Sequence, residues 1–186
     1  PVVHSEGRAY PVEIIYRERR LDERIDDSVA SAIRAALANE DGSVLAFLPG
    51  TGEIAATARI LDGRLPADVK LYELHGSLEQ SVQDEAIRTP PAGTRKVVLA
   101  TSIAETSITI DSVRVVIDSG LQRLPKFEPS SGLTRLETVR ASKASVDQRA
   151  GRAGRTAPGK AIRLWHQGQT AVLPDFTPPE ILEADL

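Results

Sequence analysis

Apolar and polar positions follow two different periods along this chain, and the order in which these periods alternate predicts the fold. Short apolar runs bounded by turn-forming residues predict strands at 10–16, 43–48, 69–74, 95–100 and 112–118. Between the first four of these runs, apolar residues recur every three to four positions and predict helices at 22–39, about 52–62 and about 79–88. Strands that alternate with helices pair in parallel through right-handed crossovers. The pattern therefore predicts an α/β fold with a mostly parallel sheet.

Two segments in the second half of the chain break this alternation. Residues 121–127 and 133–139 alternate in polarity on either side of the turn-forming residues 128–132, so we expect a β-hairpin over about 120–140. The hairpin carries local positive charge, from Arg123, Lys126, Arg135 and Arg140. A further strand is expected at 160–165.

Composition narrows the possible functions. A chain of 186 residues can bury the core of one domain. The net charge of −3 offers no general attraction for nucleic acid, so any such binding must be local. Cysteine is absent, which excludes disulfides and thiolate metal sites, and we expect no metal site within this chain. Without a signal peptide or an apolar run of bilayer length, we expect a cytoplasmic location and no membrane partner.

The segment 148–155 places three arginines at intervals of three residues, interleaved with alanine and glycine. On a helix, Arg149, Arg152 and Arg155 would fall within roughly 120° of one another and share one side. Guanidinium groups on a face with little steric bulk suit a phosphate chain, and Gln148 could orient a water molecule. A solvated helix end or a disordered RNA-binding patch are the alternatives.

The segment 101–111 concentrates five hydroxyl groups and two carboxylates between two predicted strands. Ligands bind at the carboxyl ends of strands in open α/β sheets, so these side chains are candidates for a site. The alternative is a polar loop whose serine and threonine residues cap a helix.

Both segments resemble signatures of one family, the DEAH-box helicases of superfamily 2. Residues 101–111 resemble motif V, with the pattern T-N-I-A-E-T-S-[LI]-T-I, and Ser102 stands where that family usually has asparagine. Residues 148–155 resemble motif VI, 44–50 resemble motif IV, and 71–78 resemble the strand and loop that follow it. The opening residues 1–12 are similar to the interlobe link of the bacterial HrpB-type branch.

The resemblance implies a second RecA-like lobe, which is a three-layer sandwich with a β-hairpin protruding between motifs V and VI. It implies an interlobe linker at 1–10, the lobe at 11–173, and a link at 174–186 towards a missing C-terminal domain. Such helicases bind ATP and Mg²⁺ between two lobes, so the expected partners are the first lobe and the C-terminal domains of the same polypeptide. Single-stranded nucleic acid is the further partner, with RNA favoured over DNA. In that family the hairpin separates strands.

The resemblance also implies roles for individual residues. Gln148 would position the attacking water, and Arg152 and Arg155 would contact the β- and γ-phosphates as arginine fingers. Arg149 would contact the nucleotide, or else brace the helix or pair with an acid. Thr109 and Asp111 would approach the ribose, and Ile87 stands where relatives stack an aromatic on adenine. The nucleic-acid backbone would be contacted by Thr101, Ser102, Thr106, Gly50 and His75.

Three other interpretations compete. Residues 50–55 fit the dinucleotide-binding pattern G-x-G-x-x-A, with Glu73 at a plausible distance for a ribose. Residues 154–161 nearly fit a P-loop, but Ala161 lacks the hydroxyl that holds magnesium, and the segment would leave a helix and open a strand. A non-catalytic nucleic-acid-binding module is the third. Because neither a Walker A motif nor an Asp-Glu-Ala-His box is present, and methionine is absent even at position 1, we expect an excised fragment that is inactive alone.

Overall fold

The computed structural model describes residues 10–178, and a six-stranded parallel sheet forms its centre. The strand order is β1-β8-β5-β2-β4-β3, and every neighbouring pair is parallel. The strands are β1 (Val12–Tyr16), β2 (Ser43–Phe47), β3 (Val69–Leu74), β4 (Arg95–Ala100), β5 (Val113–Asp118) and β8 (Gly159–Arg163). The predicted α/β class and parallel sheet are confirmed.

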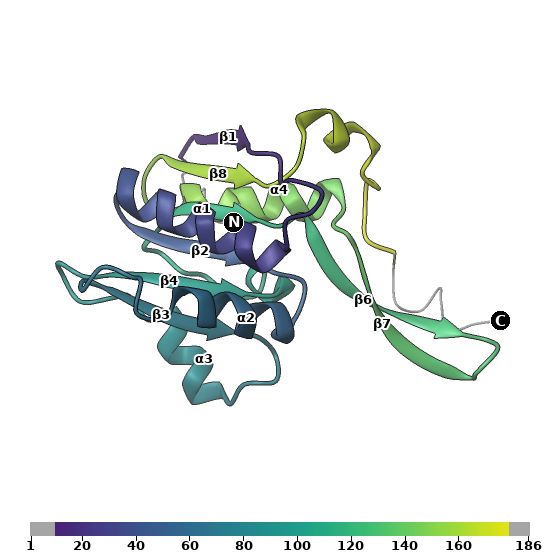
Figure 1. Ribbon diagram of the computed structural model, residues 1–186. Coiled ribbons are helices and arrows are strands. Elements are labelled where there is room, and N and C mark those ends of the chain that lie inside the picture. Colours follow the sequence, from purple (N-terminus) through teal and green to yellow (C-terminus); the bar gives the residue numbers. More distant parts are fainter. Residues whose placement is uncertain (1–9, 179–186) are drawn as a thin grey trace, which may run out of the picture.

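Helices cover both faces of this sheet, so the domain has three layers (Figure 1). Helices α1 (Ile25–Asn39) and α2 (Thr51–Leu61) pack on one face, where Ile33, Leu61 and Val97 belong to a single buried cluster. The opposite face carries α3 (Gln80–Ile87) and α4 (Lys143–Gly151). Burial of both faces explains why β2, β4 and β5 are nearly continuous apolar runs.

The arginine-rich segment departs from the single helix that was predicted for it. Helix α4 begins at Lys143, after Ser142 accepts a hydrogen bond from the amide of Ser145, and it ends at Gly151. A short 3₁₀ turn, η2 (Arg152–Gly154), follows. Gly154 packs tightly against β1, because a Cβ at this position would lie 2.5 Å from the carbonyl oxygen of Tyr10. Gly154 therefore allows this turn to pack closely against the start of β1.

The predicted hairpin is confirmed as β6 (Leu121–Glu128) and β7 (Leu133–Arg140), paired antiparallel in a sheet of their own. Figure 1 shows it projecting from the domain. An ion pair of 2.6 Å between Arg123 and Glu53 ties its base to helix α2. Most of β7 is exposed, so the outer hairpin is free to touch a partner.

The described part of the chain contains two further 3₁₀ turns. One, η1 (Ser102–Ala104), lies inside the segment 101–111, and the other, η3 (Gln167–Val172), was not predicted. The chain then passes the start of α4, where the amide of Lys143 donates to the carbonyl of Pro174. The predicted linkers at 1–10 and 174–186 fall mostly outside the described residues and stay predictions.

Candidate nucleotide and nucleic-acid site

The segment 101–111 leaves the carboxyl end of β4 and lies against α4. Glu105 makes the contacts between this segment and the helix, and its side chain is buried. The Glu105 carboxylate accepts hydrogen bonds from Oγ of Ser145 at 2.9 Å and from Nε of Arg149 at 2.8 Å. Its main-chain oxygen accepts from Nε of Arg152 at 2.6 Å. One glutamate thus joins the hydroxyl-rich segment to the arginine-rich segment.

Arg149 is buried within this contact rather than directed at solvent. Its side chain is 1% exposed and forms a second ion pair of 2.8 Å with Asp118, at the end of β5. The guanidinium also lies 5.1 Å from the ring centroid of Phe47. Burial disfavours its charge, but Asp118 and Glu105 outweigh this and raise the pKa of Arg149. In the structure Arg149 pairs with acids, which was one of the interpretations of this residue. A contact between Arg149 and a nucleotide would require both ion pairs to break.

The other two arginines follow helix α4, Arg152 in the turn η2 and Arg155 directly after it. Arg152 is half-buried and Arg155 is exposed. Burial of Arg152, together with the positive charge of Arg155, lowers the pKa of Arg152. An anion beside Arg152 would offset both its burial and the neighbouring positive charge, so this pair of arginines is a candidate anion site. Gln148 lies exposed one helical turn before Arg152.

The end of the segment 101–111 reaches the same surface. Thr109 and Asp111 are exposed, and Oγ1 of Thr156 donates to the carbonyl of Asp111 at 2.7 Å. This hydrogen bond places Asp111 beside the residue that follows Arg155. Asp111, which was predicted to approach the ribose, therefore lies next to the arginine-rich segment.

Ile87 is the last residue of α3 and is half-buried. Its backbone is fixed from both sides, because Nζ of Lys96 donates to the carbonyls of Ala86 and Arg88 at 2.5 Å. Lys96 is 1% exposed and also lies 5.6 Å from the ring centroid of Tyr72. Burial lowers the pKa of Lys96 to about 8. Nothing in the sequence pattern indicated this buried lysine.

The residues predicted to contact nucleic acid follow three neighbouring strands, β2, β4 and β3, at their carboxyl ends. Ser102 and Thr106 are exposed, Thr101 and His75 are half-buried, and Gly50 is buried. A Cβ at Gly50 would meet the guanidinium of Arg123 at 2.2 Å, so the glycine permits the hairpin base to approach α2. The structure thus brings all five to one edge of the sheet but leaves only the hydroxyl-bearing loop open.

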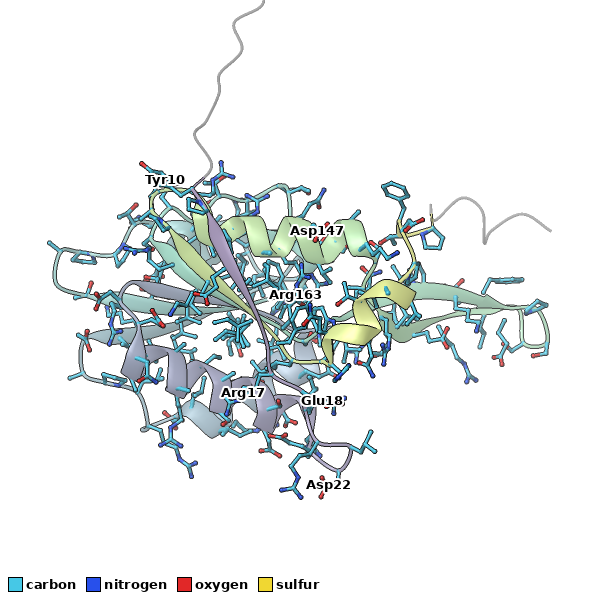
Figure 2. The ribbon with its side chains drawn as sticks, turned by 90° about the horizontal axis from the view of Figure 1, so that it is seen from above. Tyr10, Arg17, Glu18, Asp22, Asp147 and Arg163 are labelled. Carbon is cyan, nitrogen blue, oxygen red and sulfur yellow. The ribbon has the colours of Figure 1, made fainter. Side chains whose placement is uncertain are left out.

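A second buried arginine supports α4 and was not predicted. Arg163, in β8, donates to Oδ1 of Asp147 at 3.1 Å and to the hydroxyl of Tyr16 at 3.0 Å. Figure 2 shows Arg163 below helix α4, towards Asp147. Because Asp147 directly precedes Gln148, Arg163 helps to fix the part of the helix that carries this predicted water-positioning group. A strand arginine gives no local sequence signal for such a role.

Comparisons with known proteins identify the class of protein to which this fold and this site belong. Residues 27–157 match the helicase conserved C-terminal domain, so the chain belongs to that family. It is 48% identical over 186 residues to the ATP-dependent RNA helicase HrpB of Escherichia coli (strain K12), covering 100% of this chain and 23% of that protein. It is 40% identical over 190 residues to the pre-mRNA-splicing factor ATP-dependent RNA helicase DEAH10 of Arabidopsis thaliana, covering 99% and 26%.

Solved structures give the same result. The crystal structure of the E. coli DExH-box NTPase HrpB matches with a TM-score of 0.90 at 47% identity, covering 96% of this chain and 22% of that one. The predicted RecA-like fold of an HrpB-type second lobe is thereby confirmed. The chain spans about a quarter of the length of these relatives.

The competing dinucleotide interpretation is excluded by this family membership. The glycines of 50–55 lie at the start of α2, where Arg123 pairs with Glu53. The P-loop-like segment 154–161 does run from a helical turn into strand β8, as the sequence predicted. Within residues 10–178, no helix is long and apolar enough to cross a membrane. A cytoplasmic location stays a prediction.

Proposed function

We propose that this chain is the lobe of an ATP-dependent RNA helicase that supplies arginine fingers to a nucleotide held by a first lobe. The observation that carries the proposal is the cluster at the end of α4, in which the charge of Arg155 acts on the neighbouring, half-buried Arg152. Asp111 joins this cluster through the hydrogen bond between its carbonyl and Thr156, the residue that follows Arg155. The names of both relatives described above contain the words ATP-dependent RNA helicase.

The residues present fit part of a nucleotide site. Arg152 and Arg155 would contact the β- and γ-phosphates, Thr109 and Asp111 the ribose, and Ile87 the base. ATP with Mg²⁺, when bound, supplies the phosphoryl group that is transferred to water. The described residues contain no cluster of three acidic or histidine side chains that could hold a metal ion, so the magnesium ligands would come from the first lobe.

The chemical contribution of this lobe would be electrostatic. In phosphoryl transfer, negative charge on the moving group must be stabilised without covalent help, and a guanidinium donates planar N–H groups to it. Gln148 would orient the attacking water from the preceding helical turn. Arg149 would not touch the nucleotide, but its ion pairs with Glu105 and Asp118 would fix the helix that directly precedes the two fingers.

The nucleic acid would lie along the carboxyl edge of β2, β4 and β3. Ser102 and Thr106 present exposed hydroxyls there, and such groups donate to phosphate oxygens without reading the base sequence. The projecting hairpin would meet the strand or duplex beyond this edge. Residues 121–140 carry four basic and two acidic side chains, a net charge of +2 in a chain whose net charge is −3, although three of the basic groups already pair with carboxylates.

The test uses the full-length protein that contains this chain. ATP hydrolysis is measured with and without single-stranded RNA, and strand separation is measured on an RNA duplex with a single-stranded overhang. The proposal predicts Mg²⁺-dependent hydrolysis that RNA accelerates. A protein that binds RNA but does not hydrolyse ATP would be a non-catalytic binding module, and the proposal would be rejected.

A further inference from the structure

A crevice lies at the carboxyl ends of β1, β8 and β5, apart from the residues assigned above to nucleotide and nucleic acid. It contains a cavity of about 140 Å³, formed by the loop after β1, the base of the hairpin and the turn η3. The chain after β1 leads to α1 on one face of the sheet, whereas the chain after the neighbouring β8 passes the start of α4, on the opposite face. Ligands bind in open α/β sheets where connections diverge in this way. We call this site the β1–β5 crevice.

The inner wall of the crevice is apolar and fixed in place. Gly120 has a φ of +72°, and a Cβ there would lie 2.7 Å from Cε3 of Trp165, so glycine lets the indole ring pack against this turn. Nε1 of Trp165 donates to Oγ1 of Thr170 at 3.0 Å, and the Tyr16 ring meets the indole in a T-shaped arrangement. The wall is therefore preformed, which lowers the entropic cost of binding a ligand.

The rim of the crevice is cationic. Three arginines line it, and they are Arg19, Arg20 and Arg140. The one carboxylate on the rim is that of Glu18, so the charged groups that line the crevice have a net charge of +2. Among the described residues, only Arg20 of the three arginines pairs with a carboxylate, that of Asp22, and both of these side chains are largely exposed. Exposed pairs are weak, so the rim suits an anion.

Arg140 connects the crevice to the hairpin. Three of the four basic side chains in residues 121–140 pair with carboxylates. The fourth, Arg140, is exposed and stands opposite Leu121 at the base of the hairpin. The basic group of the hairpin that no described carboxylate neutralises is thus the one that lines this cavity.

The base of the hairpin separates the crevice from the surface proposed above for a single strand. The hairpin follows β5, which lies in the middle of the strand order β1-β8-β5-β2-β4-β3. Ser102 and Thr106 follow β4 on one side of β5, whereas Arg19 and Trp165 follow β1 and β8 on the other. Figure 1 shows the loop after β1 and the yellow turn η3 on one side of the hairpin base, and α2 and β4 on the other. Two strands that pass on either side of the hairpin would each meet one of these surfaces.

We propose that the β1–β5 crevice binds a nucleotide of a second nucleic-acid strand, with its phosphate on the arginines of the rim and its base or sugar towards Trp165. Guanidinium groups donate to phosphate oxygens in forks, and such contacts carry no base-sequence information. The cavity of about 140 Å³ is similar in size to one of roughly 150 Å³ that holds benzene, so it admits one ring. This inference rests on the proposed function and adds a site for the strand that the hairpin parts from the first.

The first experiment measures binding of the full-length protein to RNA duplexes without ATP. The duplex carries a 3′ oligo(U) tail, a 5′ oligo(U) tail or both, and free oligo(U) is the single-stranded reference. Wild type should bind the two-tailed fork at least about tenfold more tightly than the better one-tailed duplex, because the second contact is intramolecular. The double variant Arg19→Gln, Arg140→Gln should lose this advantage and keep the wild-type Kd for oligo(U).

Salt dependence distinguishes a phosphate contact from a structural effect. Each lost phosphate contact lowers the slope of log Kd against log salt by about one. The double variant should therefore show a lower slope for the two-tailed fork and an unchanged slope for oligo(U). The control variant Arg34→Gln, Arg59→Gln removes the same charge from exposed positions in α1 and α2, outside the crevice, and should retain both the advantage and the slope.

Crosslinking of the wild-type protein locates the second strand without any variant. 4-Thiouridine is placed in one tail of the fork at a time, and the crosslinked peptides are mapped by mass spectrometry. One tail should crosslink to residues 17–21 or 164–169, and the other should crosslink elsewhere. If neither tail reaches these residues, the crevice contacts protein instead and the inference is overturned.

The remaining outcomes are equally decisive. A two-tailed fork without an advantage in wild type, or a double variant that behaves like the control, also overturns the inference. If RNA stimulates ATP hydrolysis but the fork results are negative, only this inference fails. If the fork results are positive and the protein does not hydrolyse ATP, the crevice binds nucleic acid and the proposed function fails.

Discussion

Arg149 donates from Nε to Oε1 of Glu105 across 2.8 Å, and this contact joins the segment after β4 to helix α4. The two residues are separated by 44 positions in the chain. Because the same guanidinium pairs with Asp118, one buried cation compensates two buried carboxylates. The packing of α4 against the sheet therefore depends on a charge cluster as well as on apolar contacts.

Replacing Arg149 by methionine should destabilise the domain strongly. Removing one partner of a buried ion pair leaves uncompensated charge, and here two carboxylates would remain. We expect Arg149→Met to lower the free energy of unfolding by about 3–5 kcal/mol. The chain has a single tryptophan, Trp165, which is buried, so its fluorescence during urea unfolding measures the change.

An exposed pair on the hairpin provides the control for this prediction. Arg135 lies 3.4 Å from Glu128, and the Arg135 side chain is 71% exposed. Arg135→Gln should change the free energy of unfolding by no more than about 1 kcal/mol, as expected for a surface pair. Equal effects of the two substitutions would show that burial does not determine the strength of the Arg149 cluster.

Lys96 gives the domain a stability that depends on pH. The pKa of Lys96 is lowered from 10.5 to about 8 by burial, so between these values the unfolded chain binds more protons than the folded one. Stability should therefore rise with pH across this window, by up to about 3 kcal/mol. Both carbonyl contacts can persist, because a neutral amine still has two N–H donors.

Comparison with Lys96→Met isolates this effect from other groups that titrate in the same range. The difference in free energy of unfolding between wild type and variant should shift in favour of wild type as the pH rises from 8 to 10.5. Urea midpoints at several pH values measure it. A difference that stays constant over this range would contradict the lowered pKa.

The fold was largely predictable from the sequence because the central strands are buried on both faces. Strands 69–74 and 95–100 were predicted at the observed bounds, since their apolar runs end in turn residues. Helix α1 begins at Ile25 instead of residue 22, because Arg24 adopts an extended conformation and pairs with Asp26. Short-range sequence patterns thus predict the presence and type of an element more accurately than the residue at which it begins.

The site was predictable in its parts but not in its connections. Helical periodicity placed three arginines on one side, but the helix ends at Gly151 and Arg149 turns inward. Its partner Asp118 is 31 positions away, and Arg123 and Glu53 are 70 positions apart. Such pairs depend on the assembled sheet, so no local pattern indicates them.

Shortening the hairpin should impair unwinding and leave basal ATP hydrolysis largely intact. Replacing Leu124 to Leu133 with a short Gly/Ser turn removes the outer hairpin but keeps Arg123 and its contact with Glu53. In the full-length protein, basal ATPase should change little, while strand separation or RNA stimulation should fall. A shortened protein that unwinds duplexes at the parental rate would show that the hairpin is a surface decoration.

The isolated chain should bind ATP weakly and should not hydrolyse it. It carries candidate fingers but no phosphate-binding loop, and its exposed guanidinium groups are screened by water and salt. Calorimetric titration of the isolated chain with ATP should detect at most a weak event. A low-micromolar or tighter affinity, or Mg²⁺-dependent turnover abolished by Arg155→Ala, would indicate a complete site.

The central claim is that Arg152 and Arg155 act on the transition state, and the steady-state ATPase of the full-length protein tests it most directly. Arg152→Ala and Arg155→Ala should each lower kcat by about 10³-fold or more with little change in KM for ATP, because the fingers meet their charge mainly as the phosphoryl group leaves. Arg→Lys should fail as well, since a point charge does not replace a planar fork. Arg135→Ala on the exposed hairpin serves as the control and should leave basal kcat near the wild-type value. If either finger variant keeps near-normal kcat, that arginine is not a finger and the assignment of this surface is wrong.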